Sequence, residues 1–374
     1  MTDKPQFVEE RGQKVKLNNL CSRGKSSLRQ KDVSNDGPYA VYGASGLVGT
    51  MASFQNTVPY VAVVKDGAGV GRASACEANT SVLGTMQALI PREGIDRDYL
   101  LHLVRSLHLG DGFSGSTIPH IYFKDYGKLP VRLHSPAEQK RIVDIFASIE
   151  RQIKVSKQQL DQLDSLVKSR FVEMFGDPCD ANGNKAKVKV ASICELRIGP
   201  FGSALHKNDY ISGGHPLINP SHIIGSSIIP DADLTVSDDK YKSLEAYHLL
   251  PGDIVLGRRG EIGRCAVVQD KGFLCGTGSM VLRPRAGVRS EYLQRVVSFP
   301  SFRQALERNA VGVTMKNLNA KIVGAADMCL PSINQQDDFI SFTKQVDKSR
   351  FVAQQQIGKL QMLYDSLAQE YFGD

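Results

Sequence analysis

Several short motifs in this 374-residue sequence resemble catalytic signatures, but each of them is incomplete. Gly24-Lys25-Ser26 matches the end of a phosphate-binding loop, yet Asn19 stands where the pattern G-x-x-x-x-G-K-[ST] requires glycine. Asn219-Pro220-Ser221 lacks the second proline and the aromatic residue of an adenine-methyltransferase motif. Glu138-Gln139-Lys140 matches only the E-x-K end of a nuclease signature. We therefore expect no catalytic residue in this chain and no enzyme activity of its own.

Basic or amide residues on glycine-supported loops are stronger candidates, because such loops let the backbone approach a DNA duplex. Lys and Arg contact phosphates, whereas Arg, Lys, Asn or Gln can read base edges in the major groove. The candidates in the first half of the chain are Arg23, Lys25, Lys65 and Arg72, and those in the second half are His206, Lys207, Arg258, Arg259 and Lys316. Each of them could instead be a solvated surface charge.

The basic charge is concentrated in two blocks of the chain. Residues 1–132 hold 16 Lys and Arg against 12 Asp and Glu, a net of +4, and residues 178–332 hold 19 against 14, a net of +5. Residues 133–177 hold 7 against 7, and residues 333–374 hold 4 against 6. Two separate basic surfaces fit two contacts with a polyanion such as DNA. A basic protein with no nucleic-acid role stays an open alternative.

The cysteines and histidines predict no metal site. The seven cysteines are scattered and form no C-x-x-C pair, and the eight histidines form no H-x-x-x-H pair. An odd number of scattered cysteines argues against a disulfide framework and favours the reducing cytoplasm. The longest apolar run, residues 58–64, is far shorter than the ~20 residues of a membrane span. We expect no membrane segment and no signal peptide.

An internal repeat determines which elements position the basic loops. Residues 133–177 and 330–374 align without a gap at an offset of 197, with 13 identical positions that include the closing Phe-Gly-Asp. Neither copy has a proline inside the helical stretch. Ser135–Glu138 and Ser332–Gln335 read as helix capping boxes, and Gly176 and Gly373 stand at the expected C-terminal caps. Each copy is therefore predicted to be one long helix.

Apolar residues recur every seven positions along both copies, which is typical of a coiled coil. The predicted interface residues are Phe146, Ile149, Ile153, Leu160, Leu163 and Val167 in the first helix, and Val346, Ala353, Ile357, Leu360, Tyr364 and Leu367 in the second. We expect the two helices to pair antiparallel with pseudo-two-fold symmetry. The alternative is that each helix packs only on its own domain.

The blocks before the helices echo each other more faintly. Each mixes short β-rich runs, such as residues 60–64, 253–256 and 265–268, with glycine turns and one helix near its end. The expected helices are residues 98–107 and 291–306. We predict an α/β (α+β) fold with a domain at 1–132, a helix at 133–177, a similar domain at 178–332 and a helix at 333–374.

The order block, helix, block, helix resembles the specificity subunit of type I restriction–modification systems over essentially the whole chain. The local matches are the run Tyr39–Gly49, the glycine-rich turn before Gly71-Arg72, the G-x-T turns at Gly115 and Gly312, and the Ser135-Pro136-Ala137-Glu138-Gln139-Lys140 helix start. The second helix departs from this start, because Ser332-Ile333-Asn334-Gln335-Gln336 lacks the Pro and Glu. Its docking edge is therefore in doubt.

The resemblance implies a non-catalytic subunit with two target-recognition domains, each reading one half of a split target in double-stranded DNA. It implies that the helices act as a spacer and dock two methyltransferase (modification) subunits, which restriction subunits then join. S-adenosylmethionine is expected on the partner methyltransferase and no cofactor on this chain. Two half-sites on one face of the duplex should lie ~34 Å apart.

Two other functions remain open from the sequence. The chain could be the specificity component of a different methylation or restriction enzyme that is built from the same modules. It could also be a coiled-coil scaffold that binds only proteins, although a scaffold would not show the steep salt dependence that phosphate contacts give.

Overall fold

The computed structural model describes residues 12–115, 119–179, 187–201, 204–312 and 316–373. The chain divides into two compact units, and each unit takes one part of each long helix. Unit 1 comprises Met1–Gln159 and Ala353–Asp374, and unit 2 comprises Leu160–Val352. The predicted boundaries instead separate each globular block from the long helix that follows it. The division into two units does not test these boundaries, so they stay a prediction. The predicted G-x-T turns extend into 116–118 and 313–315, outside the described residues.

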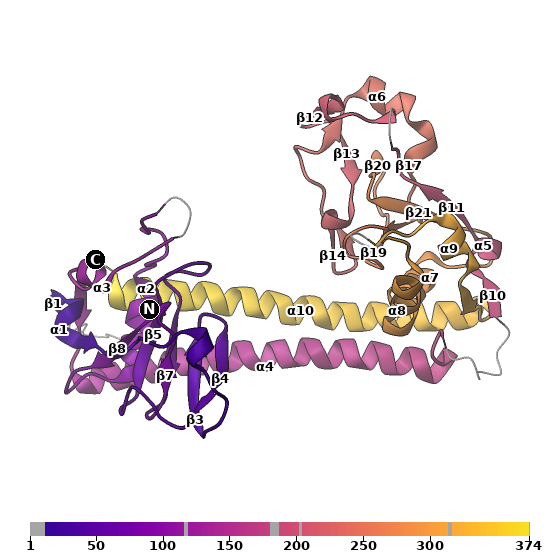
Figure 1. Ribbon diagram of the computed structural model, residues 1–374. Coiled ribbons are helices and arrows are strands. Elements are labelled where there is room, and N and C mark those ends of the chain that lie inside the picture. Colours follow the sequence, from indigo (N-terminus) through magenta and orange to yellow (C-terminus); the bar gives the residue numbers. More distant parts are fainter. Residues whose placement is uncertain (1–11, 116–118, 180–186, 202–203, 313–315, 374) are drawn as a thin grey trace, which may run out of the picture. The chain divides into compact units, whose positions relative to one another are not determined.

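Unit 1 contains a four-stranded antiparallel sheet in the order β2-β8-β5-β6, a three-stranded sheet β4-β3-β7 and the pair β1-β9. Its elements before the long helix are β1 (Gln13–Lys16), α1 (Leu17–Leu20), β2 (Cys21–Arg23), β3 (Tyr39–Gly43), β4 (Gly46–Met51), β5 (Tyr60–Val64), β6 (Ala73–Cys76), β7 (Ser81–Val82), β8 (Met86–Pro91), α2 (Arg97–Ser106), α3 (Phe123–Tyr126) and β9 (Pro130–Leu133) (Figure 1). All five residues of β5 are buried, which explains its uninterrupted apolar sequence.

Unit 2 repeats this plan with the sheet β11-β21-β18-β19 and the pair β10-β22. Its five-stranded sheet β12-β16-β13-β20-β17 extends the counterpart of β4-β3-β7, because β13 pairs antiparallel with β16 and parallel with β20 as β3 does with β4 and β7. Its strands are β10 (Lys187–Lys189), β11 (Cys194–Ile198), β12 (Tyr210–Ile211), β13 (His215–Ile218), β14 (Ile223–Ile224), β15 (Ser227–Ile228), β16 (Thr235–Val236), β17 (His248–Leu249), β18 (Ile254–Gly257), β19 (Cys265–Val267), β20 (Phe273–Cys275), β21 (Ser279–Pro284) and β22 (Asp327–Cys329). Its short helices are α5 (Val190–Ile193), α6 (Asp238–Ser243), α7 (Ser290–Ser298), α8 (Pro300–Asn309) and α9 (Ala320–Ala325). The predicted α+β class is confirmed.

One predicted helix is wrong in its extent. Residues 291–306 were expected to form a single helix, but α7 ends at Ser298 and α8 begins at Pro300. Phe299 between them has an extended backbone with φ −63° and ψ 136°. The proline ring disfavours a helical conformation at the residue before it, so the chain breaks there and starts a new helix with proline at the first position.

Both long helices are present, α4 over Pro136–Phe175 and α10 over Ile333–Phe372. The second capping box is complete, because the Gln335 N–H donates to the Ser332 hydroxyl at 3.4 Å and the Ser332 N–H donates to Gln335 Oε1 at 3.2 Å. Gly176 has a φ of +78°, which confirms the predicted C-terminal cap. Gly373 also follows the last helical residue, Phe372, and its N–H donates to Gln369 O at 2.9 Å as that of Gly176 does to Val172 O at 2.8 Å, but it lacks the positive φ of Gly176.

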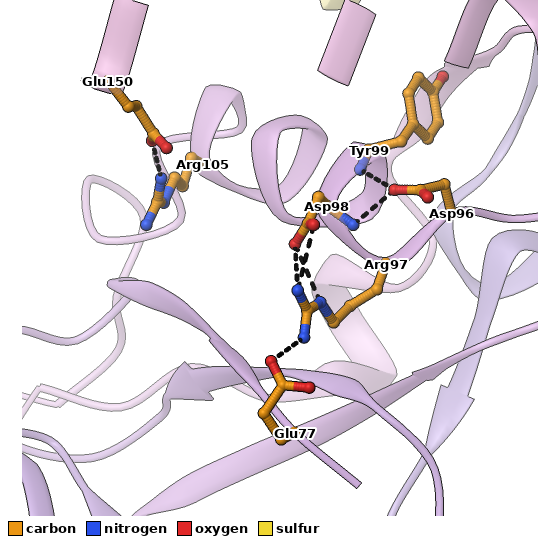
Figure 2. Close-up of polar contacts among 7 residues, drawn as sticks. All are labelled: Glu77, Asp96, Arg97, Asp98, Tyr99, Arg105 and Glu150. Atoms are coloured by element: carbon orange, nitrogen blue, oxygen red, sulfur yellow. Dashed lines mark hydrogen bonds and ion pairs between the residues drawn. The ribbon is translucent and has the colours of Figure 1, made fainter. Parts of the chain in front are cut away.

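The helix α2 of unit 1 begins at a well-defined cap. The Asp96 carboxylate accepts hydrogen bonds from the N–H groups of Asp98 at 2.8 Å and Tyr99 at 3.0 Å (Figure 2). Arg97 forms ion pairs with Asp98 at 2.9 Å and with Glu77 at 2.6 Å, which ties the start of α2 to the segment after β6. The acidic side chains of this first turn also face the positive end of the helix dipole.

An ion pair in each unit joins one of these short helices to a long one. In unit 1, Arg105 of α2 binds Glu150 of α4 at 2.7 Å (Figure 2). In unit 2, Arg295 of α7 binds Asp347 of α10 at 3.5 Å. Glu150 and Asp347 are 197 residues apart, so the repeat places an acidic residue at the same point of each long helix.

A buried glutamine near the start of each long helix fixes the preceding block to it. The Gln139 side chain accepts from Asp96 N–H at 2.9 Å and donates to Gly94 O at 3.2 Å and His134 O at 3.0 Å. Gln336 makes the same three bonds in unit 2, with Arg289, Gly287 and Pro331. Both glutamines lie at identical positions of the repeat, and sequence reasoning gave neither of them a role.

Within each unit the two long helices also contact each other. In unit 1, the ring of Phe146 lies 4.7 Å from that of Tyr364 and 6.1 Å from that of Phe372. In unit 2, the ring of Phe171 lies 5.4 Å from that of Phe339. Early residues of α4 therefore meet late residues of α10, and late residues of α4 meet early ones. The predicted antiparallel pairing is confirmed, and the alternative in which the helices share no interface is wrong.

The aromatic cluster of unit 1 encloses a buried histidine. The His102 ring stacks on Phe146 at a centroid distance of 4.6 Å, and its Nδ1 lies 2.8 Å from the Tyr364 hydroxyl. Burial, with a smaller contribution from the charge of Arg105, lowers the pKa of His102 from 6.5 to about 4, although Asp98 and Asp96 oppose this shift. His102 is therefore neutral in the folded protein at neutral pH.

Acid should destabilise unit 1 through His102. Between pH 6.5 and pH 4 the unfolded chain binds a proton at this residue while the folded chain does not, so the free energy of unfolding falls as pH falls. The full effect is at most about 3 kcal/mol, from 1.36 kcal/mol per pKa unit. Urea unfolding at several pH values should show a shallower pH dependence for His102→Gln than for the unchanged chain.

The exposed Gln354 supplies the control, since Gln354→Ala removes no ionisable group and should leave the pH dependence unchanged. Equal slopes for His102→Gln and the unchanged chain would show that His102 does not titrate differently on folding.

Candidate nucleic-acid interface

The topology of unit 1 brings its four predicted DNA-binding residues to one edge of the main sheet. Strands β2 and β5 both pair antiparallel with β8, so they run parallel and their C-terminal ends meet where β8 begins. Arg23 ends β2 and Lys25 follows it, while Lys65 and Arg72 bound the loop after β5. Lys65 is half-buried and the other three are exposed. We call this edge the β2–β5 edge.

A buried amide holds the first loop of the β2–β5 edge in place. Asn56 Oδ1 accepts from the Lys25 N–H at 3.0 Å, and Asn56 Nδ2 donates to the Lys25 carbonyl at 3.1 Å. Gln55 adds a hydrogen bond to the Ser27 hydroxyl at 2.8 Å. The backbone of Lys25 is therefore fixed while its ammonium group is exposed. Sequence reasoning missed Asn56, because it acts on a residue 31 positions away.

Three glycines shape the second loop of this edge. Gly67, Gly69 and Gly71 all have positive φ, near +85°, which other residues rarely adopt. The Arg72 guanidinium donates to the carbonyl of Gly69 at 3.3 Å and to those of Ala44 and Ala68 at 3.4 Å. A Cβ atom at Gly69 would overlap this guanidinium. Arg72 therefore organises the loop with its hydrogen bonds while its charge remains at the surface.

Unit 2 builds the equivalent edge from β11 and β18, both antiparallel to β21. Arg258, directly after β18, is only 6% exposed. Its Nε donates to Asn317 Oδ1 and to the Leu318 carbonyl, both at 3.1 Å. Burial, then the neighbouring charge of Arg259, lowers the pKa of Arg258. This placement changes the role that we assign to Arg258, from direct DNA contact to support of the loop.

The other candidates of unit 2 are exposed but do not all share one place. Arg259 follows β18, and its backbone forms a bridge with Asn317, the residue after Lys316. His206 and Lys207 lie in the turn that leads into β12, the edge strand of the five-stranded sheet. The structure therefore brings Arg259 and Lys316 together, whereas His206 and Lys207 belong to a different part of the unit. Their assignment as DNA contacts stays a prediction.

The predicted interface residues of the long helices all lie on buried or half-buried positions. Those that are buried are Phe146, Ile149, Val167, Val346 and Ala353, and those that are half-buried are Ile153, Leu160, Leu163, Ile357, Leu360, Tyr364 and Leu367. The prediction omitted the aromatic residues at the helix ends. Phe175 and Phe372 are both buried, and the identical Phe-Gly-Asp endings of the two copies were the signal that could have indicated them.

The described residues show no metal-binding group and no membrane-spanning helix. They contain no group of three or more His, Cys, Asp or Glu side chains that could hold a metal ion. None of the helices within the described ranges is long and apolar enough to cross a membrane. Two sheet edges with ordered backbone and exposed Lys and Arg side chains are suited to contact phosphates and base edges.

The family profile described as type I restriction modification DNA specificity domain matches this chain twice, over residues 9–165 and 182–361. The chain belongs to this family. Because the family is defined by DNA specificity, the chain is a recognition subunit and not a catalytic one. The two matches correspond to the two copies of the repeat, so the duplication is one of whole specificity domains.

Two solved structures share the fold. The S subunit of the type I restriction–modification system from M. genitalium is 13% identical with a TM-score of 0.56, and the match covers 98% of each chain. The second is a chain from a structure that describes complex assembly and conformational transition of the type I R-M system. It is 14% identical with a TM-score of 0.58, and the match covers 98% of this chain and 99% of that one. A comparison with curated proteins gave no match.

Proposed function

We propose that this chain reads a bipartite, asymmetric target in double-stranded DNA, with one half-site recognised by each unit. The observation that carries the proposal is the duplicated sheet edge, where ordered loops present exposed Lys and Arg side chains. The side chains at the two edges differ, so the two half-sites should differ in sequence. Phosphate contacts would set the register, and a smaller number of base contacts would give the specificity.

Exposed apolar residues on the long helices support docking of two copies of one partner. Val155 and Val352 are 62% and 61% exposed, and Leu166 and Leu363 are 48% and 47% exposed. Both pairs are 197 residues apart, so the repeat preserves the residue type together with its exposure. Eleven residues make about three helical turns, so the two residues on each helix lie on one side of it.

This apolar side of α4 points away from the globular block of unit 1. Val155 follows Glu150 by five residues, which places it about 140° around the helix from the carboxylate that binds Arg105. We propose that Val155 and Leu363 in unit 1, and Leu166 and Val352 in unit 2, each dock an apolar helix of a modification subunit. Two equivalent sites fit two modification subunits.

The partners would supply the chemistry that this chain lacks. The modification subunits are proposed to carry S-adenosylmethionine and to methylate the bound DNA, and restriction subunits are proposed to join the same complex. The continuous helices α4 and α10, each 40 residues long, are proposed to set the spacer between the half-sites. A specificity component of another enzyme type remains the second candidate, because it would use the same modules.

Sequencing of modified bases in the host genome tests this function. A strain that expresses the chain with its partners should show one methylated bipartite motif, and a strain without the gene should lose methylation at that motif. Val155→Glu with Leu363→Glu should weaken docking at one site and reduce methylation, because buried carboxylates would replace apolar contacts. Gln354→Glu, about 200° around α10 from Val352, is the matched control and should have no effect.

Unchanged methylation after removal of the gene would contradict the DNA-reading role. Full methylation by the doubly substituted chain would contradict the docking surface alone.

A further inference from the structure

In unit 1, the loop after the central strand β5 is hydrogen-bonded to residues 120–121, which lie at the same edge of the sheet. The Ile121 N–H donates to the Lys65 carbonyl at 2.9 Å, and Asp66 forms a β-bridge with His120. The side chains of the bridged residues also meet, since His120 Nδ1 lies 2.7 Å from Asp66 Oδ1. Both side chains are partly exposed at this point.

Unit 2 has the same backbone arrangement with different side chains. The Leu318 N–H donates to the Arg258 carbonyl at 3.0 Å, and Arg259 forms a β-bridge with Asn317. Asn317 Oδ1 accepts from the buried Arg258, while the side chain of Arg259 is exposed. We call these equivalent points the loop junctions, defined by Asp66 and His120 in unit 1 and by Arg259 and Asn317 in unit 2.

The two loop junctions therefore offer opposite hydrogen-bonding groups. An ionised Asp66 only accepts hydrogen bonds, and the guanidinium of Arg259 only donates them. A carboxylate at a cationic edge is repelled by DNA phosphates, so in contact with DNA it is favourable where it meets a donor on a base. In the major groove, guanine presents the acceptors N7 and O6, and cytosine presents the N4 amino donor. Adenine also presents an amino donor, N6, but beside the acceptor N7, which would repel a carboxylate.

We infer that the loop junctions are base-reading elements, and that Arg259 reads a guanine in one half-site while Asp66, held by His120, reads a cytosine in the other. This inference rests on the proposed function. Arg259 can approach N7 and O6 of guanine with two parallel N–H groups. His120 fixes the carboxylate through one oxygen and leaves the other available for the cytosine amino group.

The test uses the complex of the full chain with its modification subunits and duplexes carrying each base pair at each position of the target. Arg259→Lys keeps the charge but replaces the rigid planar pair of donors with a flexible ammonium group, so guanine preference at one position should fall roughly tenfold while overall affinity is retained. Asp66→Asn keeps an acceptor for His120 and should lower cytosine preference in the other half-site by a similar factor.

Arg285→Gln and Glu93→Gln are matched controls, since both exposed residues follow strands that end at the opposite edges of the two sheets, after β21 and β8. Neither control should change any base preference, and all four variants should unfold at the temperature of the unchanged complex. Unaltered preferences in Arg259→Lys and Asp66→Asn, or losses spread equally over both half-sites, would overturn the inference. A wild-type complex that binds every duplex equally would instead contradict the proposed function.

Discussion

The hydrophobic core of each unit includes a phenylalanine from the last turn of the long helix that belongs to the other copy of the repeat. Phe372, at the end of the second copy, packs edge-on against Tyr99 in unit 1 with the ring centroids 5.5 Å apart. Phe175, at the end of the first copy, packs in the same way against Tyr292 in unit 2 at 5.2 Å. Removing a buried phenylalanine from such a core costs about 3–5 kcal/mol, which is a large part of the stability of a domain. Neither block is therefore complete without the other copy.

The two units share this arrangement, but different side chains join the short helix to the long helices in each. Unit 1 places His102 between Phe146 and Tyr364, whereas unit 2 places Arg295 and Asp347 at the corresponding interface and adds an ion pair between Arg350 and Asp164. Both units also contain buried aromatic rings and an ion pair from a short helix to a long one, so the difference is His102 in unit 1 against Arg295 in unit 2. Exchanging these two side chains would leave polar partners unpaired. This difference favours the pairing of unlike copies within one chain. The same divergence appears at the β2–β5 edge and its counterpart in unit 2, where Asp66 and Arg259 occupy equivalent positions.

Sequence patterns were sufficient where the structural cause is local or periodic. The seven-residue spacing predicted both long helices, because a helix presents one side at that interval, and the apolar run at residues 60–64 predicted β5. Where contacts between residues far apart in the chain decide, no local pattern indicates the outcome. The burial of Arg258 depends on Asn317, 59 residues away, and the fixing of Lys25 depends on Asn56. The break before Pro300 was local and could have been predicted from the residue before proline.

Hydrogen exchange on the full chain tests most directly whether each helix end completes the core of the other copy's block. The Phe372→Ala chain should lose amide protection in α2 and β9, in a segment more than 230 residues away in sequence, while α7 and β22 keep theirs. The Phe175→Ala chain should show the opposite pattern, with protection lost in α7 and β22. If Phe372→Ala loosened α7 instead, or if neither substitution changed protection outside its own helix, the account of two interlocked units would be contradicted.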